Sequence, residues 1–249
     1  MDRDTLHGMG KICSYCGKRY ERLGQHWGYN PEHQPNLTNL QQDILTGVIM
    51  GDGNVKRDND RNPYIRVRSI TKDYLEYLDN IFGELSLGVD LRYTAEEKAK
   101  ENNERGFTNG ASAENYSDQY LWKTRRSKQF QEFADWYSSG KKSWPTVTLT
   151  PAVLKHLYVC GGHYNNTDSN NYISISCSNE RSNKEKVEEI FSNSGFNVAY
   201  WNESKRNNFG YEGTISASIV FDVPTTQDMF EFMGEPIPGF EYKWPDQNS

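Results

Sequence analysis

The chain shows an apolar helical pattern in residues 44–53 (ILTGVIMGDG), which ends at an acidic residue followed by glycine. Glycine within a helix costs about 1 kcal/mol relative to alanine, so Gly47 and Gly51 indicate close approach by a second helix. Gly53 ends the helix and leaves Asp52 at its C-terminal end, where the helix dipole does not stabilise a carboxylate. A bound cation would explain this position. The alternative is an ordinary core helix with a glycine cap.

A second helical pattern occupies residues 153–163 (VLKHLYVCGGH). Aligned with the first, it places Gly161 opposite Asp52 and His156 opposite Gly47. The second copy therefore lacks the acid, and the histidine argues against equally tight helix packing at that position.

The pattern after each copy also repeats. In the first half, periodicity predicts strands near 63–70, 89–94 and 119–127 and helices at 71–85 and 128–137. In the second half it predicts strands at 171–178, 197–202 and 214–221 and helices at 184–194 and 225–233. The charged segment 96–117, rich in Gly, Asn and Ser, is expected to be a long flexible loop. Both halves are interpreted as helix–strand–strand–helix–strand–strand–helix, with ranges assigned to three of the four strands in each. This order predicts an α+β fold of two pseudo-symmetric αββαββα halves at 38–145 and 146–249.

Composition narrows the class of protein. The chain has 249 residues and a formal net charge of −6, which argues against a strongly basic nucleic-acid coat protein. Residues 146–249 carry seven basic and thirteen acidic side chains, so a DNA-binding surface would have to be a local stripe elsewhere. No apolar run is long enough to span a membrane and no secretory signal opens the chain, so we expect a cytoplasmic protein without membrane contact.

Residues 1–37 form a third unit with a candidate zinc site. Cys13 and Cys16 have zinc-knuckle spacing, and His26 and His33 follow. Four such ligands suit tetrahedral Zn²⁺, and so short a segment needs a staple to fold. The set is similar to a short Cys₂His₂ finger with altered intervals. The alternative is a reduced turn with incidental histidines.

The chain resembles the LAGLIDADG homing endonucleases, in the single-chain form that carries two motifs, over roughly residues 38 to 240. LTGVIMGDG at 45–53 matches the motif well, and LKHLYVCGG at 154–162 is a degenerate match. The resemblance implies two motif helices packed side by side beneath saddle-shaped sheets that straddle double-stranded DNA. It also implies a monomer that hydrolyses phosphodiesters with Mg²⁺ or another divalent cation and that serves the mobility of an intron or intein.

The resemblance assigns Asp52 as the first acid and a Mg²⁺ ligand, and Lys123 as the basic catalytic residue or, alternatively, a phosphate contact. Gly161 holds the position of the missing second acid. Three explanations stay open: a degenerate enzyme that only binds or nicks DNA, an engineered knockout, or a different carboxylate that reaches the site.

The polar strand faces are candidate DNA-binding surfaces, because arginine can pair with guanine or hold phosphates. In the first half the candidates are Arg66, Arg68, Arg92, Lys123 and Arg125. In the second half they are Ser174, Ser176, Ser178, Tyr200, Asn202, Thr214, Ser216 and Ser218, helped by Lys205 and Arg206. For any single residue, a solvated sheet face is the simpler interpretation.

Three functions compete. The first is a site-specific endonuclease, impaired or limited to nicking by Gly161. The second is a non-catalytic DNA- or RNA-binding protein on the same scaffold, such as a maturase or regulator. The third is a zinc-bearing interaction protein that contacts no nucleic acid.

Overall fold

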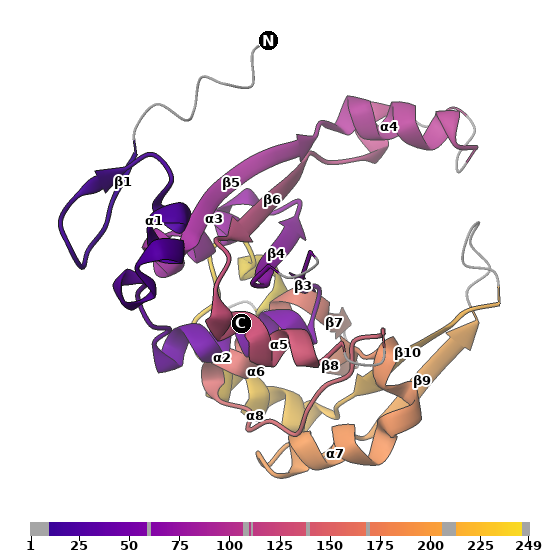
Figure 1. Cartoon of the computed structure of the whole chain (residues 1–249). Helices are drawn as coiled ribbons and strands as arrows, with labels where there is room; N and C mark the ends of the chain where they lie inside the picture. Colours follow the sequence, from indigo (N-terminus) through magenta and orange to yellow (C-terminus); the bar gives the residue numbers. More distant parts are fainter. Residues whose placement is uncertain are drawn as a thin grey trace.

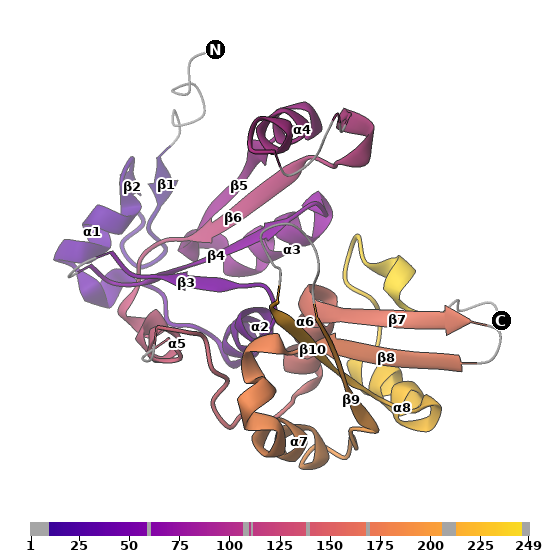
Figure 2. The same ribbon diagram turned by 90° about the vertical axis from the view of Figure 1, so that its right-hand side faces the viewer.

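A computed structural model of the chain describes residues 10–58, 61–106, 110, 112–137, 140–167, 170–205 and 213–245. Its main body contains two four-stranded antiparallel sheets, with helices packed against each (Figures 1 and 2). The α+β fold of two pseudo-symmetric halves predicted from the repeated pattern is confirmed.

The first half follows the predicted order of elements with one insertion. Its elements are α2 (Asn39–Met50), β3 (Asn54–Lys56), β4 (Tyr64–Ser69), α3 (Lys72–Phe82), β5 (Ser86–Tyr93), α4 (Ala95–Glu104), β6 (Gln119–Thr124) and α5 (Gln131–Asp135). Short 3₁₀ turns at Gly83–Leu85, Ala113–Asn115 and Lys128–Phe130 join them. The strands pair in the order β3-β4-β6-β5.

The second half repeats this arrangement. Its elements are α6 (Pro151–Gly161), β7 (Gly162–Thr167), β8 (Asn170–Ser176), α7 (Lys184–Ser192), β9 (Tyr200–Lys205), β10 (Ile215–Val220) and α8 (Val223–Met233), with 3₁₀ turns at Ser178–Asn183 and Glu241–Lys243. The strand order β7-β8-β10-β9 corresponds strand for strand to that of the first half.

The small N-terminal unit packs on the first half. It consists of β1 (Lys11–Ile12), β2 (Arg19–Tyr20), α1 (Leu23–Tyr29) and a 3₁₀ turn at Pro31–His33. Cys13, Leu23 and Trp27 are buried and belong to the same hydrophobic core as both halves.

Local sequence explains where the two motif helices begin. Thr38 caps α2 through a capping box, in which Gln41 N donates to Thr38 Oγ1 at 3.2 Å and Thr38 N donates to Gln41 Oε1 at 3.0 Å. Thr150 caps α6 by a single bond, in which Val153 N donates to Thr150 Oγ1 at 3.2 Å, and Pro151 occupies the first turn. The Thr150 hydroxyl also donates to Asp43 Oδ2 at 2.8 Å, which ties the start of α6 to α2.

The prediction of a long flexible loop at 96–117 was wrong for its first part. Residues Ala95–Glu104 form helix α4, because Thr94 and Glu97 make a second capping box. Ion pairs from Lys98 and Arg105 to Glu101 then support the exposed helix. Residues 107–109 and 111 of that segment lie outside the described residues.

Nowhere in the described part of the chain is there a helix with the length and apolar character needed to cross a bilayer.

Candidate functional site

The ends of the two motif helices meet, as the glycines predicted. A Cβ on Gly47 would overlap the Val153 carbonyl oxygen, and one on Gly51 would overlap the Cys160 side chain. Glycine at both positions therefore permits the close contact of α2 with α6. The expected loosening at His156 does not occur, because Gly47 leaves room for its side chain.

His156 is buried in this helix contact, where the hydroxyl group of Tyr74 is its hydrogen-bond partner. Its Nδ1 lies 3.0 Å from the hydroxyl of Tyr74, which also lies 3.5 Å from Cys160 Sγ. Burial lowers the pKa of His156 to about 3, so the imidazole is neutral at physiological pH. The histidine is therefore a packing and hydrogen-bonding residue of the interface between the halves.

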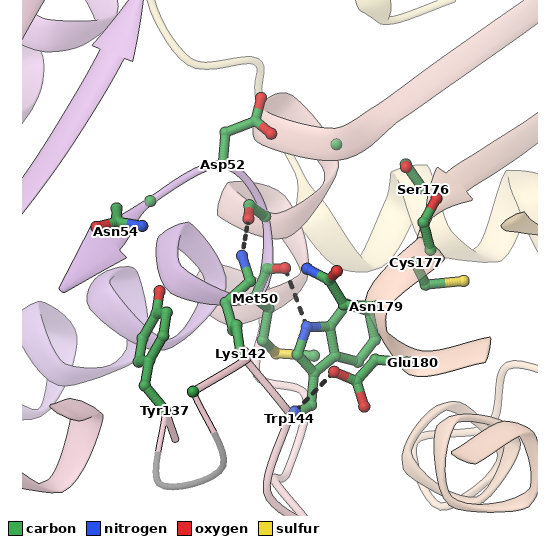
Figure 3. Close-up of a pocket in the computed structure, with 15 residues that line it drawn as sticks. Met50, Asp52, Asn54, Tyr137, Lys142, Trp144, Ser176, Cys177, Asn179 and Glu180 are labelled. Carbon is green, nitrogen blue, oxygen red and sulfur yellow. Dashed lines mark hydrogen bonds between the residues drawn. The ribbon is translucent and has the colours of Figure 1, made fainter. Parts of the chain in front are cut away.

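A hollow of about 420 Å³ lies where the two helices end (Figure 3). It is lined by Met50, Gly51, Asp52, Gly53, Asn54, Tyr137, Gly140, Lys142, Trp144, Gly161, Ser176, Cys177, Ser178, Asn179 and Glu180. The predicted first acid and the predicted position of the second acid therefore lie in one site, contributed by both halves.

The side chain of Asp52 reaches solvent in the turn after α2. The protein around it nevertheless removes part of the hydration of its carboxyl group, and this desolvation raises the pKa of that group. The charges of Lys142 and Lys243 act in the opposite direction and lower that pKa. The carboxylate is thus within electrostatic range of two ammonium groups, one from each half. Lys142 lines the hollow, whereas Lys243 does not.

Lys142 and Lys243 were not predicted from the sequence. Lys142 Nζ donates to the carbonyl oxygen of Ile49 at 2.8 Å and to that of Gly51. Lys243 Nζ donates to the carbonyl oxygens of Val159 at 2.9 Å and Gly162 at 2.7 Å. Each lysine therefore satisfies free carbonyls at the C-terminal end of its own motif helix.

Both lysines have a lowered pKa because of burial, while Asp52 raises it. One sequence signal could have identified them. Residues 142–145 (KSWP) and 243–245 (KWP) are a short repeat that follows the last helix of each half.

Gly161 is the last residue of α6 and carries no acid, but the site has space for one. A Cβ there would lie 3.9 Å from Gly51 Cα and 3.8 Å from the Ser176 carbonyl oxygen, both ordinary contacts. The second carboxylate is therefore absent because residue 161 is glycine, and not because the backbone would block a side chain there.

Glu180 is the one other carboxylate among the residues that line the hollow within the described part of the chain. It is fully buried. Its Oε1 accepts from Trp144 N at 3.0 Å and its Oε2 from Ser143 Oγ at 3.4 Å. These bonds hold the segment that carries Lys142, so the role of Glu180 is structural.

Lys123, the predicted basic residue, does not line this hollow. It lies on the outer face of β6, opposite Arg66 in the register, and pairs with Asp90 at 3.2 Å. The structure therefore places Lys123 with the candidate DNA-binding residues.

Three of the predicted arginines cluster on the outer face of the first sheet. Arg66 and Arg68 project from β4, and Arg92 lies on β5. Partial burial lowers the pKa of Arg68, and the positive charges of Arg92 and Arg66 lower it further. Arg125 lies apart from them: its Nε donates to the Glu84 carbonyl at 2.9 Å.

The outer face of the second sheet is polar and uncharged, as predicted. Ser176, Ser218 and Asn202 are cross-strand neighbours on β8, β10 and β9. Ser216 Oγ lies 2.8 Å from Ser204 Oγ, and the exposed Lys205 ends β9. Ser174 lies on β8, whereas Ser178 bonds the backbone of Ala217. Arg206 lies outside the described residues.

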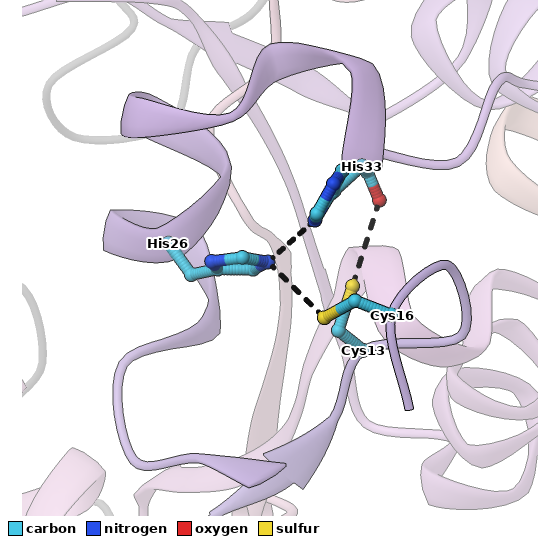
Figure 4. A group of neighbouring side chains, drawn as sticks. All are labelled: Cys13, Cys16, His26 and His33. Carbon is cyan, nitrogen blue, oxygen red and sulfur yellow. Dashed lines mark hydrogen bonds between the residues drawn. The ribbon is translucent and has the colours of Figure 1, made fainter. Parts of the chain in front are cut away.

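The four predicted zinc ligands converge in the N-terminal unit (Figure 4). Their ligand atoms all lie within 4.8 Å of one another. His26 Nε2 is 2.9 Å from His33 Nδ1 and 3.7 Å from Cys16 Sγ. Zinc bonds of about 2.0 to 2.3 Å in tetrahedral geometry give donor separations of about 3.3 to 3.8 Å, and the two His26 distances are close to this range.

Neighbouring groups orient these ligands. The Asn30 side-chain amide lies 3.2 Å from His26 Nδ1, on the opposite side of the ring from Nε2, which is directed at the cluster. With Nε2 bound to zinc, Nδ1 would carry the proton and donate it to the Asn30 amide oxygen. The pKa of the Cys16 thiol is lowered, chiefly by a hydrogen bond from the backbone of Lys18, which favours the thiolate that binds metal.

Comparison with known proteins supports the fold and the motif. Residues 42–211 match the family model described as the LAGLIDADG DNA endonuclease family. No curated protein matches the chain.

Among solved structures, the homing endonuclease I-WcaI bound to its DNA recognition sequence is similar with a TM-score of 0.60 and 14% identity, over 85% of this chain and 88% of that one. The N-terminal LAGLIDADG domain of DUF199/WhiA gives a TM-score of 0.45 and 10% identity, over 78% of this chain and 80% of that one. A variant of I-DmoI in complex with its target DNA gives 0.42 and 13%, over 78% and 94%.

Proposed function

Because the chain belongs to the LAGLIDADG DNA endonuclease family, we propose that it binds a specific double-stranded DNA site across its two sheets and hydrolyses a phosphodiester bond at Asp52. The observation that carries this proposal is the position of Asp52, which lies where the two motif helices meet and within electrostatic range of two lysines. Since Gly161 offers no second carboxylate, we infer that cleavage is confined mainly to one strand.

The donor atoms at the site suit a hard divalent cation such as Mg²⁺. Besides Asp52, Asn54 is among the residues that line the hollow, and its side-chain oxygen is buried and has no hydrogen-bond partner among the described residues. Oxygen ligands of this kind are those that Mg²⁺ prefers. When bound, the cation would lower the pKa of a water molecule and stabilise charge on the phosphate.

The protein's own residues would supply the remaining chemistry. In the hydrolysis, water adds to phosphorus, the bond to one deoxyribose oxygen breaks, and that oxygen takes a proton. Each ammonium group has three donors, and Lys142 and Lys243 each direct two at helix carbonyls. The third donor of each would stabilise the negative charge that develops on the phosphate.

The cations along β4 would hold the DNA in register. Arg66 and Arg68 lie next to each other on the outer face of the first sheet and would contact base edges or phosphates. The serine-rich face of the second sheet would bind by hydrogen bonds and shape. Lys123 would act there as a phosphate contact.

We also propose that Cys13, Cys16, His26 and His33 bind one structural Zn²⁺. Support comes from the convergence of their ligand atoms and from the Asn30 contact that orients His26. We assign residues 1–37, 38–145 and 146–249 to the zinc unit and the two halves, and expect the protein to act as a monomer, because both motif helices belong to one chain.

The decisive experiment is cleavage of a randomised plasmid library with Mg²⁺ present. Relaxed circles recovered at one sequence support the proposal of a site-specific nicking enzyme. Selective binding of one sequence without any broken strand would favour the second candidate, a non-catalytic DNA-binding protein. The observation that favours this second candidate is that residue 161 is glycine and supplies no carboxylate.

A further inference from the structure

We propose that the N-terminal zinc unit carries a second DNA contact, which holds the phosphate backbone of the duplex that flanks the core target on the side of the first half. This inference rests on the proposed DNA-binding function and extends its footprint. It concerns a surface formed jointly by α1 and Arg61, which precedes β4.

The N-terminal unit is fixed to the first half and can therefore act as part of its surface. Ser14 N donates to Glu84 Oε1 at 3.0 Å, and Gln34 Nε2 donates to the Arg126 carbonyl at 3.2 Å. Leu37 N donates to Gln129 Oε1 at 2.7 Å. Trp27 is buried beneath the Arg125 guanidinium, whose centre is 6.0 Å from the ring.

A hollow of about 1040 Å³ lies at this junction and is lined by Glu21, Arg22, Gly24, Gln25, Arg61 and Arg125. A second hollow of about 470 Å³ on the same unit is lined by Arg19, Tyr20, Glu21, Arg22, Gln25, His26 and Tyr29. The two share Glu21, Arg22 and Gln25, so they adjoin each other. Four arginines and a single acid line them, which makes this a basic surface on an acidic protein.

Two of these arginines are available to a ligand. Arg22 and Arg61 are exposed, and neither forms an ion pair with any residue that the structure describes. Arg22 also makes no side-chain capping bond to α1. Exposed cations that form no ion pair in a concave surface favour an anionic occupant.

This surface continues a row of two arginines on the first sheet, Arg68 and Arg66, which both face outward from β4 and are called the arginine row below. Tyr64 is the next outward-facing residue of β4, and its ring lies under the Arg126 guanidinium. Tyr64 pairs with Lys56 at the last register position of the β3–β4 hairpin, and Arg61 lies beyond that pair, three residues before Tyr64. Since β3 starts just after Asp52, this is the end of the hairpin remote from the cleavage site.

Continuity with the arginine row identifies DNA as the occupant. A duplex that crosses Arg66 and Arg68 and continues past the hairpin would next meet Arg61 and then Arg22. Arginine side chains on such a flank would contact phosphates, which carry no sequence information. The zinc unit is thus expected to add affinity without adding base specificity.

The test uses zinc-loaded full-length protein and duplexes that contain the site recovered from the plasmid library. One duplex ends at the core site, one is extended by about one helical turn on the first-half side, and one by the same length on the other side. Affinity is measured over a series of salt concentrations. Hydroxyl-radical footprints on the same duplexes show which flank is protected.

We expect tighter binding and a longer footprint only for the extension on the first-half side. The variant Arg22→Ala/Arg61→Ala should lose that gain and reduce the salt slope by about 2, because two phosphate contacts are removed. Lys18→Ala is the matched control, since Lys18 is exposed on the same unit but lines neither hollow. Zinc content and melting temperature verify folding, and Arg61→Ala alone tests the contact without altering the zinc unit.

Two failures are distinguishable. If wild-type protein binds the core site but neither extension changes affinity or footprint, the flank contact is refuted while the proposed function stands; the arginines would then serve another anionic partner. If no duplex is bound, both the flank contact and the proposed function fail.

Discussion

Lys142 and Lys243 hold equivalent places in the two halves: each ammonium closes the C-terminal end of its own motif helix, and both lower the pKa of Asp52. The pseudo-twofold symmetry of the fold therefore extends to the cations of the site, although Gly161 breaks it for the acids. The two halves thus contribute two positive charges, from Lys142 and Lys243, but only one carboxylate, from Asp52. Because the second carboxylate is missing, we expect cleavage of one strand only.

Replacing Lys142 or Lys243 by methionine should slow the nicking step. Each change removes a buried positive charge beside the reacting phosphate, and loss of one such donor costs on the order of 10²-fold in rate. DNA affinity should change little. Single-turnover nicking of pre-bound DNA measures the step directly.

The pH profile separates a role at the site from a loss of fold. Nicking requires ionised Asp52 and is lost as pH falls through its pKa, which Lys142 lowers. Lys142→Met should therefore move this acidic limb to higher pH. Lys123→Met is the control, and a slow Lys123→Met beside a normal Lys142→Met would return the catalytic role to Lys123.

The repeated architecture could be predicted from the sequence because it rests on local rules. Glycines at 47 and 51 have no use in an isolated helix, so they indicated the partner helix that the structure contains. Alternation along residues 63–70 identified the buried Ile65 and Val67 and the outward-facing Arg66. Ligand spacing alone named the four residues that converge at the candidate zinc site.

What could not be predicted depends on contacts between distant segments. Lys142 reaches the end of α2 from a segment that looked like a plain linker between the halves, because Glu180 holds Trp144. A linear pattern does not show which basic residue reaches the acid, and the family resemblance points instead to Lys123 on the outer face of its strand. Helix α4 was missed because its charged composition hid the capping box at Thr94.

The zinc site predicts one bound Zn²⁺ per chain by metal analysis. Cys13→Ser should abolish zinc binding and unfold the N-terminal segment, because so small a unit depends on its metal. Leu23 and Trp27, which pack in the common core, would lose their support, so the melting temperature of the whole protein should also fall. Zinc-free protein that melts and binds DNA normally would exclude a structural metal.

The arginine row predicts two distinguishable outcomes on substitution. Arg66→Ala or Arg68→Ala should cost about 1–3 kcal/mol of binding and relax base preference locally if the contact is to a base edge. A phosphate contact would instead weaken all sequences evenly and flatten the salt dependence. Binding to a panel of single-base variants of the target separates the two. Unchanged affinity for every duplex would mean that this sheet face is merely solvated.

The buried His156 predicts a stability that declines in acid. In the folded protein its pKa is about 3, whereas the unfolded chain takes up the proton near the ordinary value of 6.5. Below 6.5 the unfolded state therefore binds one more proton, and this group lowers the free energy of unfolding by about 1.4 kcal/mol per pH unit. Its contribution is constant above that pH.

His156→Gln should flatten the pH dependence by that amount, whatever its effect on stability at neutral pH. Urea unfolding of zinc-loaded wild-type and variant protein between pH 6 and 4.5 measures the difference. The zinc histidines are the same in both proteins, so their contribution cancels. Parallel curves for the two proteins would show that His156 is not held neutral in the fold.

The most informative change is Gly161→Asp. The site has space for the new side chain, since a Cβ at this position makes only ordinary contacts. The substitution would place a second carboxylate beside Asp52 and restore the pair that a divalent cation needs at both scissile bonds. We expect linear product where the parent protein gives relaxed circles.

Asp52→Asn is the matched control, because a carboxamide keeps the shape but loses the charge that holds the cation. It should abolish cleavage in the parent and in Gly161→Asp while leaving DNA affinity nearly unchanged. A gain of double-strand cleavage has few explanations, whereas a loss of activity has many. If Gly161→Asp binds its site and cleaves neither strand, the protein is a DNA-binding protein without catalysis; if the parent already linearises DNA, the active site does not depend on this pair.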